Sequence, residues 1–227
     1  MKFRKIILTI SLFISLISCA SIDLSVSSIN RPNTNINNSV FVIPSNKNID
    51  INDLIFQEFL SDIKIALETN GYTVTSNPEE ADQVVLLEYG ISDPQTNTVL
   101  VPQIGKTKID STNTTGLLTP GTNTTTYSGT TTYNYEYGIT GYVPRQETVY
   151  TRVLILTSYD WKLFSTTEKA IQLWKTDVIS TGSSSDLREV FPYMVLASEN
   201  YLGSNTGKKI KITINKSDTR VVKYQNN

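Results

Sequence analysis

Apolar residues with two different spacings mark the secondary structure of the first half of the chain. Residues 40–44 form a short apolar run ended by proline, which is typical of a buried strand. From about residue 50 to Gly71, apolar side chains recur every three or four positions, which predicts an amphipathic helix that stops at the glycine. Strands are expected next at 72–75 and 83–89, so the order of elements predicts a right-handed βαβ crossover.

The second half of the chain has mostly the two-residue period of strands. Tyr133, Tyr135 and Tyr137 alternate on one face of such a segment. One helical stripe follows, and Pro192 inside it should kink the helix or confine its start. The expected elements are strands at 131–137, 147–159, 170–180 and 209–214, turns at 138–144 and 160–162, and a helix that begins at Ser184, Ser185 or Asp186 and ends before Gly203.

Three segments lack these patterns. Residues 93–129 are dominated by Thr, Asn and Gly, and are expected to be either a flexible insertion or an extended hairpin. A further hypothesis is that they form an assembly element that becomes ordered only in an oligomer. Residues 19–39, rich in Ser and Asn, are expected to be a tether that spans roughly 25 Å, although Ile22–Val26 could instead be an edge strand. The polar tail 215–227 is expected to fray.

Together these elements predict one globular domain at 40–214 of class α+β, or alternatively three-layer α/β. We expect a mixed sheet of about 5–6 strands, with two main helices that cover the same face. The expected order is β-α-β-β-(long loop)-β-β-β-α-β.

The N-terminus has the pattern of a bacterial lipoprotein signal peptide at residues 1–18. A basic start precedes an apolar segment at 6–17, which is shorter than the roughly 20 residues of a membrane-spanning helix. Leu16-Ile17-Ser18-Cys19 then has the form of a lipobox, in which the thiol of Cys19 receives a diacylglyceryl group. The alternatives are an ordinary signal peptide with a chance cysteine, or a buried N-terminal helix. The lipobox predicts a protein held in the membrane by its lipid.

Ala20 and the net charge of the chain indicate where the protein lies and which partners it binds. Ala20, rather than aspartate, favours transfer to the outer membrane, with the domain in the periplasm or at the cell surface. Removal of residues 1–18 takes away Lys2, Arg4 and Lys5, so the formal charge changes from −1 to −4 (−1 − 3). A mildly acidic mature domain argues against nucleic acid as a partner.

Composition excludes several kinds of catalytic site. The chain has no histidine, and its single cysteine belongs to the lipobox, so Ser-His-Asp sites, Cys-His sites and zinc sites built on these residues are excluded. We expect no cofactor and no metal. Glu79, Glu80 and Asp82 are the densest acidic group, but Pro78–Asp82 is more typical of a turn or a short helix than of paired catalytic carboxylates. The chain is therefore not expected to be an enzyme.

Several segments resemble a family of bacterial envelope lipoproteins known only as a domain of unknown function. These are FQEFLSDIKIALETNGYTVT, the sequence Glu80-Ala81-Asp82 leading into Val84–Leu87, the strands around Trp174, and SSSDLREVFPYM. The order of elements is also similar to that of the curli secretion lipoprotein and of the N-terminal domain of the Tol translocation protein. The resemblance covers residues 40–214 and implies a fold and an envelope location rather than an activity. The Thr/Asn-rich insertion has no counterpart in it.

Two binding surfaces follow from these patterns. The strand near Lys209–Ile214 could lie at a sheet edge and accept a strand of an envelope protein, or its lysines could simply protect that edge. Alternatively, Tyr133, Tyr135, Tyr137 and Tyr142, with Tyr127, could bind glycan or peptidoglycan, or could instead pack the sheet or brace a loop. A homo-oligomer is also compatible with the sequence.

Overall fold

The hydrophobic pattern folds into two units of unequal size. The computed structural model describes residues 21–32 and 38–225, so the signal peptide and Cys19 lie outside the described residues. Unit 1 comprises Met1–Asp93 and Tyr150–Asn227, and unit 2 comprises Pro94–Val149. Each unit is described separately below.

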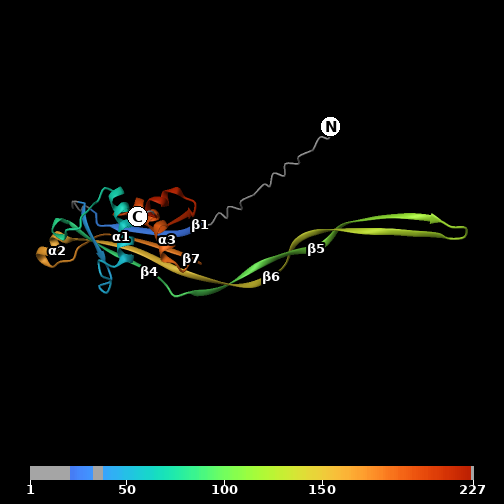
Figure 1. Cartoon of the computed structure of the whole chain (residues 1–227), viewed down its shortest axis with the longest axis horizontal. Coiled ribbons are helices and arrows are strands. Elements are labelled where there is room, and N and C mark those ends of the chain that lie inside the picture. The colour runs from blue at the N-terminus through green and yellow to red at the C-terminus, as the bar shows by residue number, and fades with distance from the viewer. Residues whose placement is uncertain (1–20, 33–37, 226–227) are drawn as a thin grey trace, which may run out of the picture. The chain divides into compact units, whose positions relative to one another are not determined.

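Eight strands are present in the described residues, together with two long helices and several short ones (Figure 1). The strands are β1 (Ser21–Asn30), β2 (Ser39–Pro44), β3 (Thr73–Val74), β4 (Gln83–Ile91), β5 (Gln95–Pro120), β6 (Thr125–Asp160), β7 (Gln172–Gly182) and β8 (Ile210–Asn215). The α-helices are α1 (Leu54–Thr69), α2 (Trp161–Thr167) and α3 (Leu187–Ser198), and the 3-10 helices are η1 (Pro78–Glu80), η2 (Glu199–Tyr201) and η3 (Thr219–Tyr224).

Unit 1 is built on a mixed sheet with the strand order β3-β2-β4-β6-β7-β1-β8. β2 runs parallel to both β3 and β4, and the remaining pairs are antiparallel. The parallel pairing of β2 with β4 on either side of α1 confirms the expected strand-helix-strand unit. The described strands number eight rather than the expected 5–6, because two polar segments that were not assigned to strands are paired.

One face of this sheet is buried beneath α1 and α3, which confirms the α+β class and the placement of both helices on the same face. Phe59 of α1 stacks on Phe191 of α3 with 3.9 Å between the ring centroids. Both side chains are almost completely buried. The buried strand residues beneath them mostly occupy every second position, and they include Leu24, Val26, Val40, Val42, Val85, Leu87, Leu154, Leu156 and Val178.

Helix α1 begins and ends where its side chains satisfy free backbone groups. The Asp53 carboxylate accepts hydrogen bonds from the backbone N–H groups of Ile55 and Phe56, both at 3.0 Å. At the other end, Gly71 adopts a φ of 80°, which is the left-handed conformation that glycine tolerates. These contacts confirm the predicted boundaries of the helix.

The tether prediction is wrong for residues 21–30, which form β1. Ile22, Leu24 and Val26 point into the core at every second position, and the Ser28 hydroxyl lies 2.7 Å from that of Thr176. Small serine side chains fit the pleat of the sheet, so a Ser-rich composition did not prevent strand formation. The edge-strand alternative was right about the strand and wrong about its position, because β1 lies between β7 and β8.

Two other polar segments also fold. The tail expected to fray contains η3, in which Val221 and Tyr224 are buried against the core. The turn expected at 160–162 is instead the start of α2, where the Asp160 carboxylate accepts a hydrogen bond from the backbone N–H of Leu163. Pro192 lies in the interior of α3 rather than in its first turn. Among the described helices, none has the length and apolar character needed to cross a membrane.

Candidate functional site

Unit 2 is a long two-stranded antiparallel hairpin (Figure 1). β5 pairs with the first part of β6 from Gln95↔Val149 near its base to Pro120↔Thr125 at its tip. β5 alone has 26 residues, which corresponds to about 85 Å at roughly 3.3 Å per residue. Of the two alternatives for residues 93–129, the extended hairpin is the one observed, but the hairpin continues to Val149.

The prediction of a turn at 138–144 is wrong, because β6 continues through Gly138, Gly141 and Pro144. Within this segment β6 contains one extra residue, between Ile139 and Gly141, and Pro144 pairs with Leu100 without a shift. The register shifts between Gln103 and Ile104, and two further shifts lie between Lys106 and Ser111. Bulges of this kind let a strand continue while they change which face its side chains occupy.

The bulges place the predicted tyrosines on one face of the hairpin. Tyr133, Tyr135 and Tyr137 alternate along β6, and the extra residue at the bulge brings Tyr142 to the same face although its number is even. We call this the aromatic face. Its aromatic and large aliphatic members, as the register assigns them, are Leu100, Ile104, Ile109, Leu118, Tyr127, Tyr133, Tyr135, Tyr137, Ile139 and Tyr142.

Side-chain contacts agree with this assignment. The Tyr133 and Tyr135 rings lie 6.5 Å apart, and the Lys106 ammonium is 3.8 Å from the centre of the Tyr135 ring. Tyr127 covers the facing pair Gly116 and Gly129, because a Cβ added at either glycine would collide with its ring. Tyr133 and Tyr135 therefore contact each other, and the register places the other tyrosines along the same face.

The aromatic face is open to solvent, although Tyr127 also covers the backbone of its own hairpin. Tyr133, Tyr137 and Tyr142 are 48%, 65% and 59% exposed. The opposite face is mainly polar. Lys108 and Glu136 form an ion pair of 2.7 Å there, and the Asn134 amide donates to the Ser111 hydroxyl at 3.0 Å. The hairpin is therefore amphipathic, with one aromatic and one polar face.

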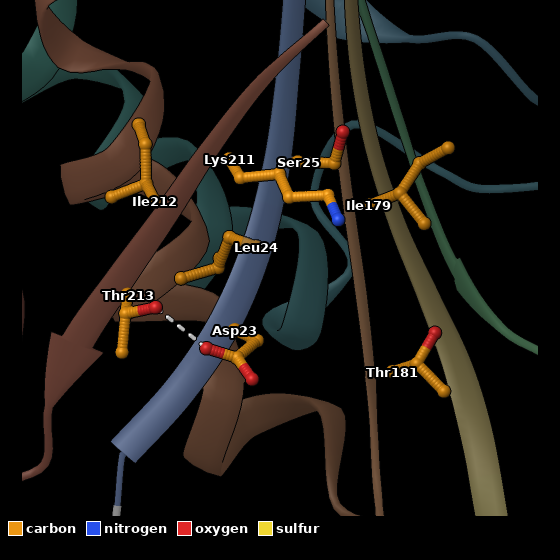
Figure 2. A pocket seen from close by; sticks show the side chains of 8 residues that line it. All are labelled: Asp23, Leu24, Ser25, Ile179, Thr181, Lys211, Ile212 and Thr213. Carbon is orange, nitrogen blue, oxygen red and sulfur yellow. Dashed lines mark hydrogen bonds between the residues drawn. The ribbon is translucent and has the colours of Figure 1, made fainter.

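A shallow groove of about 440 Å³ lies in unit 1 over β1, β7 and β8, on the sheet face opposite α1 and α3. Figure 2 shows the Lys211 side chain lying across β1, and the Thr213 hydroxyl donating to the Asp23 carboxylate at 2.7 Å. Thr181 and Ile179 complete the side of the groove formed by β7. This mixture of short polar and apolar groups offers shape and a few hydrogen bonds.

Two of the three acidic residues singled out in the sequence, Glu80 and Asp82, have structural roles. The Asp82 carboxylate is buried and forms an ion pair with Lys162. Glu80 accepts hydrogen bonds from the side chains of Asn77 and Thr75. Within residues 21–32 and 38–225, no group of three or more Asp, Glu, His or Cys side chains is arranged to hold a metal ion.

A buried arginine was not singled out by sequence reasoning. Arg152 of β6 is 2% exposed, and its guanidinium donates to the Ser184 carbonyl at 2.6 and 3.2 Å and to the Ser180 hydroxyl at 3.3 Å. Burial lowers the pKa of Arg152, and the negative charge of Glu189 opposes that effect. These bonds hold the loop before α3 against the end of the sheet, which is a structural role.

Asp62 of α1 was also missed. Its side chain faces a pocket of about 330 Å³ between α1, α3 and η3, and the residue is only 4% exposed. Burial, together with repulsion from Glu58, raises the pKa of Asp62 from 3.8 to about 7. Glu58 itself is held by a two-pronged ion pair with Arg188, with distances of 2.8 and 3.0 Å. Asp62 is thus a carboxyl group that gains its charge near neutral pH.

The titration of Asp62 predicts a pH-dependent stability. The pKa of Asp62 is higher in the folded state than in the unfolded state. Its contribution to the free energy of unfolding is therefore fully present below about pH 4 and is lost as the pH rises toward about 7. Asp62→Asn should remove that loss, and the variant should be more stable than the wild type at pH 8 by about 1–3 kcal/mol, allowing for solvent in the pocket. Urea unfolding at pH 5 and pH 8 measures the difference. The exposed Glu79→Gln serves as control, and an equal pH dependence in wild type and Asp62→Asn would contradict the assignment.

Comparison with known proteins assigns no family to the chain. Neither a protein-family model nor a curated protein sequence matches it. A crystal structure of a PDZ domain protein from Parabacteroides distasonis is similar over 88% of this chain, with a TM-score of 0.40 and 10% sequence identity. The matched region covers 41% of that chain, so the chain spans about two fifths of its length.

Proposed function

We propose that this chain is a membrane-anchored lipoprotein of the bacterial cell envelope that acts in binding and assembly rather than in catalysis. The lipobox at Cys19 and the residue Ala20 support an outer-membrane location, with the folded units in the periplasm or at the cell surface. The sequence has no histidine to act as a catalytic base, and the carboxylates of Asp82 and Glu80 are held by an ion pair and by hydrogen bonds.

The single observation that carries the proposal is the amphipathic hairpin. An isolated two-stranded hairpin is marginally stable in water, and a row of exposed aromatic rings is costly unless it is covered part of the time. The hairpin nevertheless makes up a separate unit of the chain, with nearly all of its side chains exposed. Such a structure is typical of an element that is completed by contact with another molecule.

The proposal predicts that the aromatic face carries binding. The variant with Tyr133, Tyr135 and Tyr137 all changed to alanine should lose at least about 90% of its cross-linking to envelope components in intact cells, because aromatic side chains dominate binding energy at interfaces. Formaldehyde cross-linking followed by denaturing affinity purification measures this. The control is Ser111→Ala with Asn134→Ala, which alters the polar face at one facing pair. Equal cross-linking in the two variants would remove the aromatic face from the proposal.

A second candidate function is the binding of glycan or peptidoglycan, and the row of exposed tyrosines favours it. Aromatic rings with polar tips suit the apolar faces and hydroxyls of sugars. Pelleting with purified peptidoglycan separates this candidate from protein binding. The tyrosine variant should stay in the supernatant while the wild type sediments, and sedimentation of both proteins to the same extent would rule the candidate out.

The edge strand β8 is a third surface. It lies at the end of the sheet, as the sequence predicted, and a partner strand could pair with it. Lys208, Lys209, Lys211 and Lys216 surround it, and lysines at an edge discourage strand pairing. The hairpin is therefore the better-supported binding element.

A further inference from the structure

The hairpin has two long edges that are free for pairing. In the described part of the chain β5 pairs only with β6, and β6 meets β4 and β7 only from Tyr150 onward. Along each outer edge, roughly half of the backbone N–H and C=O groups point away from the partner strand. Two edges of equal length and opposite direction thus belong to the same short segment of chain.

The half of the hairpin nearer its base, from Gln95 to Asp110 and from Glu136 to Val149, carries the features that natural proteins use to prevent edge pairing. All of the hairpin's charged residues are there, and so are all three register shifts. Pro102 and Pro144 also lie in this half and lack the N–H that a neighbouring strand would need.

The half nearer the tip has almost none of these features. Residues 111–135 contain no Asp, Glu, Lys or Arg, and the pairing from Ser111↔Asn134 to Thr119↔Thr126 is regular. Thr and Tyr, which favour strands, dominate its composition. The proline of this half, Pro120, belongs to the last pair before the turn. The contrast with the base of the hairpin, and with the lysines around β8, indicates edges that are built to pair.

We propose that the tip halves of hairpins from neighbouring copies of this chain pair edge to edge, with β5 of one copy against β6 of the next. This inference deepens the proposed function, on which it rests for the membrane anchor. When hairpins of neighbouring copies lie side by side and point in the same direction, β5-to-β6 pairing is the antiparallel arrangement that joins them. Pairing of β5 with β5 about a two-fold axis would instead point the two hairpins in opposite directions.

Edge-to-edge pairing also gives a reason for the separate aromatic and polar faces of the hairpin. Edge-to-edge pairing keeps every aromatic face on the same side of the joined sheet, so the tyrosine rows of successive copies form one larger surface. The contact is heterologous, which means that it can repeat from copy to copy and close into a ring. Anchoring in one membrane raises the effective concentration of the hairpins and favours the contact. Each added strand also relieves the marginal stability of the two-stranded hairpin.

Site-specific photo-cross-linking of the full-length lipoprotein in its membrane tests the inference. The photoreactive residue p-benzoylphenylalanine replaces Thr115 of β5, in cells that also express a copy with a different affinity tag. We expect a cross-link between differently tagged copies, with the captured peptide coming from residues 126–135. The same residue in place of Thr213 on β8 is the control, and it should not join two copies.

A shortened hairpin provides the second measurement. Replacing residues 111–134 by Asn-Gly should convert a multi-copy assembly in mild detergent to a monomer, with unit 1 unfolding at an unchanged urea concentration. A captured peptide from β5, or wild-type protein that is monomeric, would overturn the inference. If the monomeric wild type still cross-links to a different envelope protein through its tyrosines, the proposed function stands without copy-to-copy pairing. If the wild-type protein cross-links to no other molecule, the copy-to-copy pairing and the proposed function are both wrong.

Discussion

Serine in place of Cys19 is expected to abolish lipid attachment and to remove the protein from the outer-membrane fraction. A serine hydroxyl cannot form the thioether that holds the diacylglyceryl group. Each buried methylene contributes about 0.8 kcal/mol to membrane binding, so the loss of two acyl chains removes the whole anchor. Incorporation of an alkyne-tagged palmitate, followed by fractionation of the envelope, measures the effect.

The neighbouring Ser18→Ala is the matched control, because it keeps a small residue before the cysteine. It should label and fractionate as the wild type does. Palmitate label that persists in Cys19→Ser would show that the chain is not a lipoprotein of this kind. Residues 1–20 lie outside the described part of the structure, so this prediction depends on the sequence alone.

Phe191→Ala is expected to destabilise unit 1 by about 3–5 kcal/mol. The Phe191 side chain is completely buried, stacks on Phe59 and meets the edge of Tyr89, so its removal leaves a cavity between α3, α1 and the sheet. Total stabilities of single domains are about 5–15 kcal/mol. A loss of this size therefore shifts the urea midpoint strongly, and equilibrium unfolding of residues 20–227 measures it.

Phe164→Ala is the control for that experiment, since it deletes the same side chain at a site that is 38% exposed. Phe164 stacks on Trp161 in α2 with 5.7 Å between the ring centroids, and its loss should cost about 1 kcal/mol or less. Equal effects of the two substitutions would show that the α1–α3 interface does not contribute the stability that its packing indicates.

The sequence predicted the elements whose apolar spacing is regular. α1 has apolar residues every three or four positions between an aspartate cap and Gly71, and the structure places it within a few residues of the expected limits. β7, α3 and β8 were likewise found close to their predicted ranges. These elements pack directly on the core, so the core imposes its pattern on their sequences.

The misassigned segments are those in which polar residues make strands. In β1, polar residues alternate with Ile22, Leu24 and Val26, but the Ser-rich and Asn-rich composition favoured a tether over this period of two. In the hairpin, neighbouring strands pair without any core beneath them, so no buried side marks the strands. The glycines and proline of residues 138–144 resemble a turn, but β6 continues through them with a single bulge between Ile139 and Gly141.

The candidate site was only partly accessible from the sequence. The alternation of Tyr133, Tyr135 and Tyr137 was a sufficient signal for one face, whereas the membership of Tyr142 depends on a bulge that no local pattern reveals. Arg152 and Asp62 carry no such signal. A single charged residue in an otherwise regular strand or helix does not show whether its side chain enters solvent or the interior, and only the three-dimensional packing decides this.

The position of β1 has a mechanical consequence. The strand begins at Ser21, two residues after the cysteine proposed to carry the lipid, so at most about 7 Å of chain separates the two. Tension from the bilayer would then be transmitted straight to a strand that is bonded on both sides, to β7 and to β8. A pull along the strand would load those hydrogen bonds in shear, all at once, rather than breaking them one by one. The membrane would thus hold this protein by one of the most mechanically resistant parts of its fold.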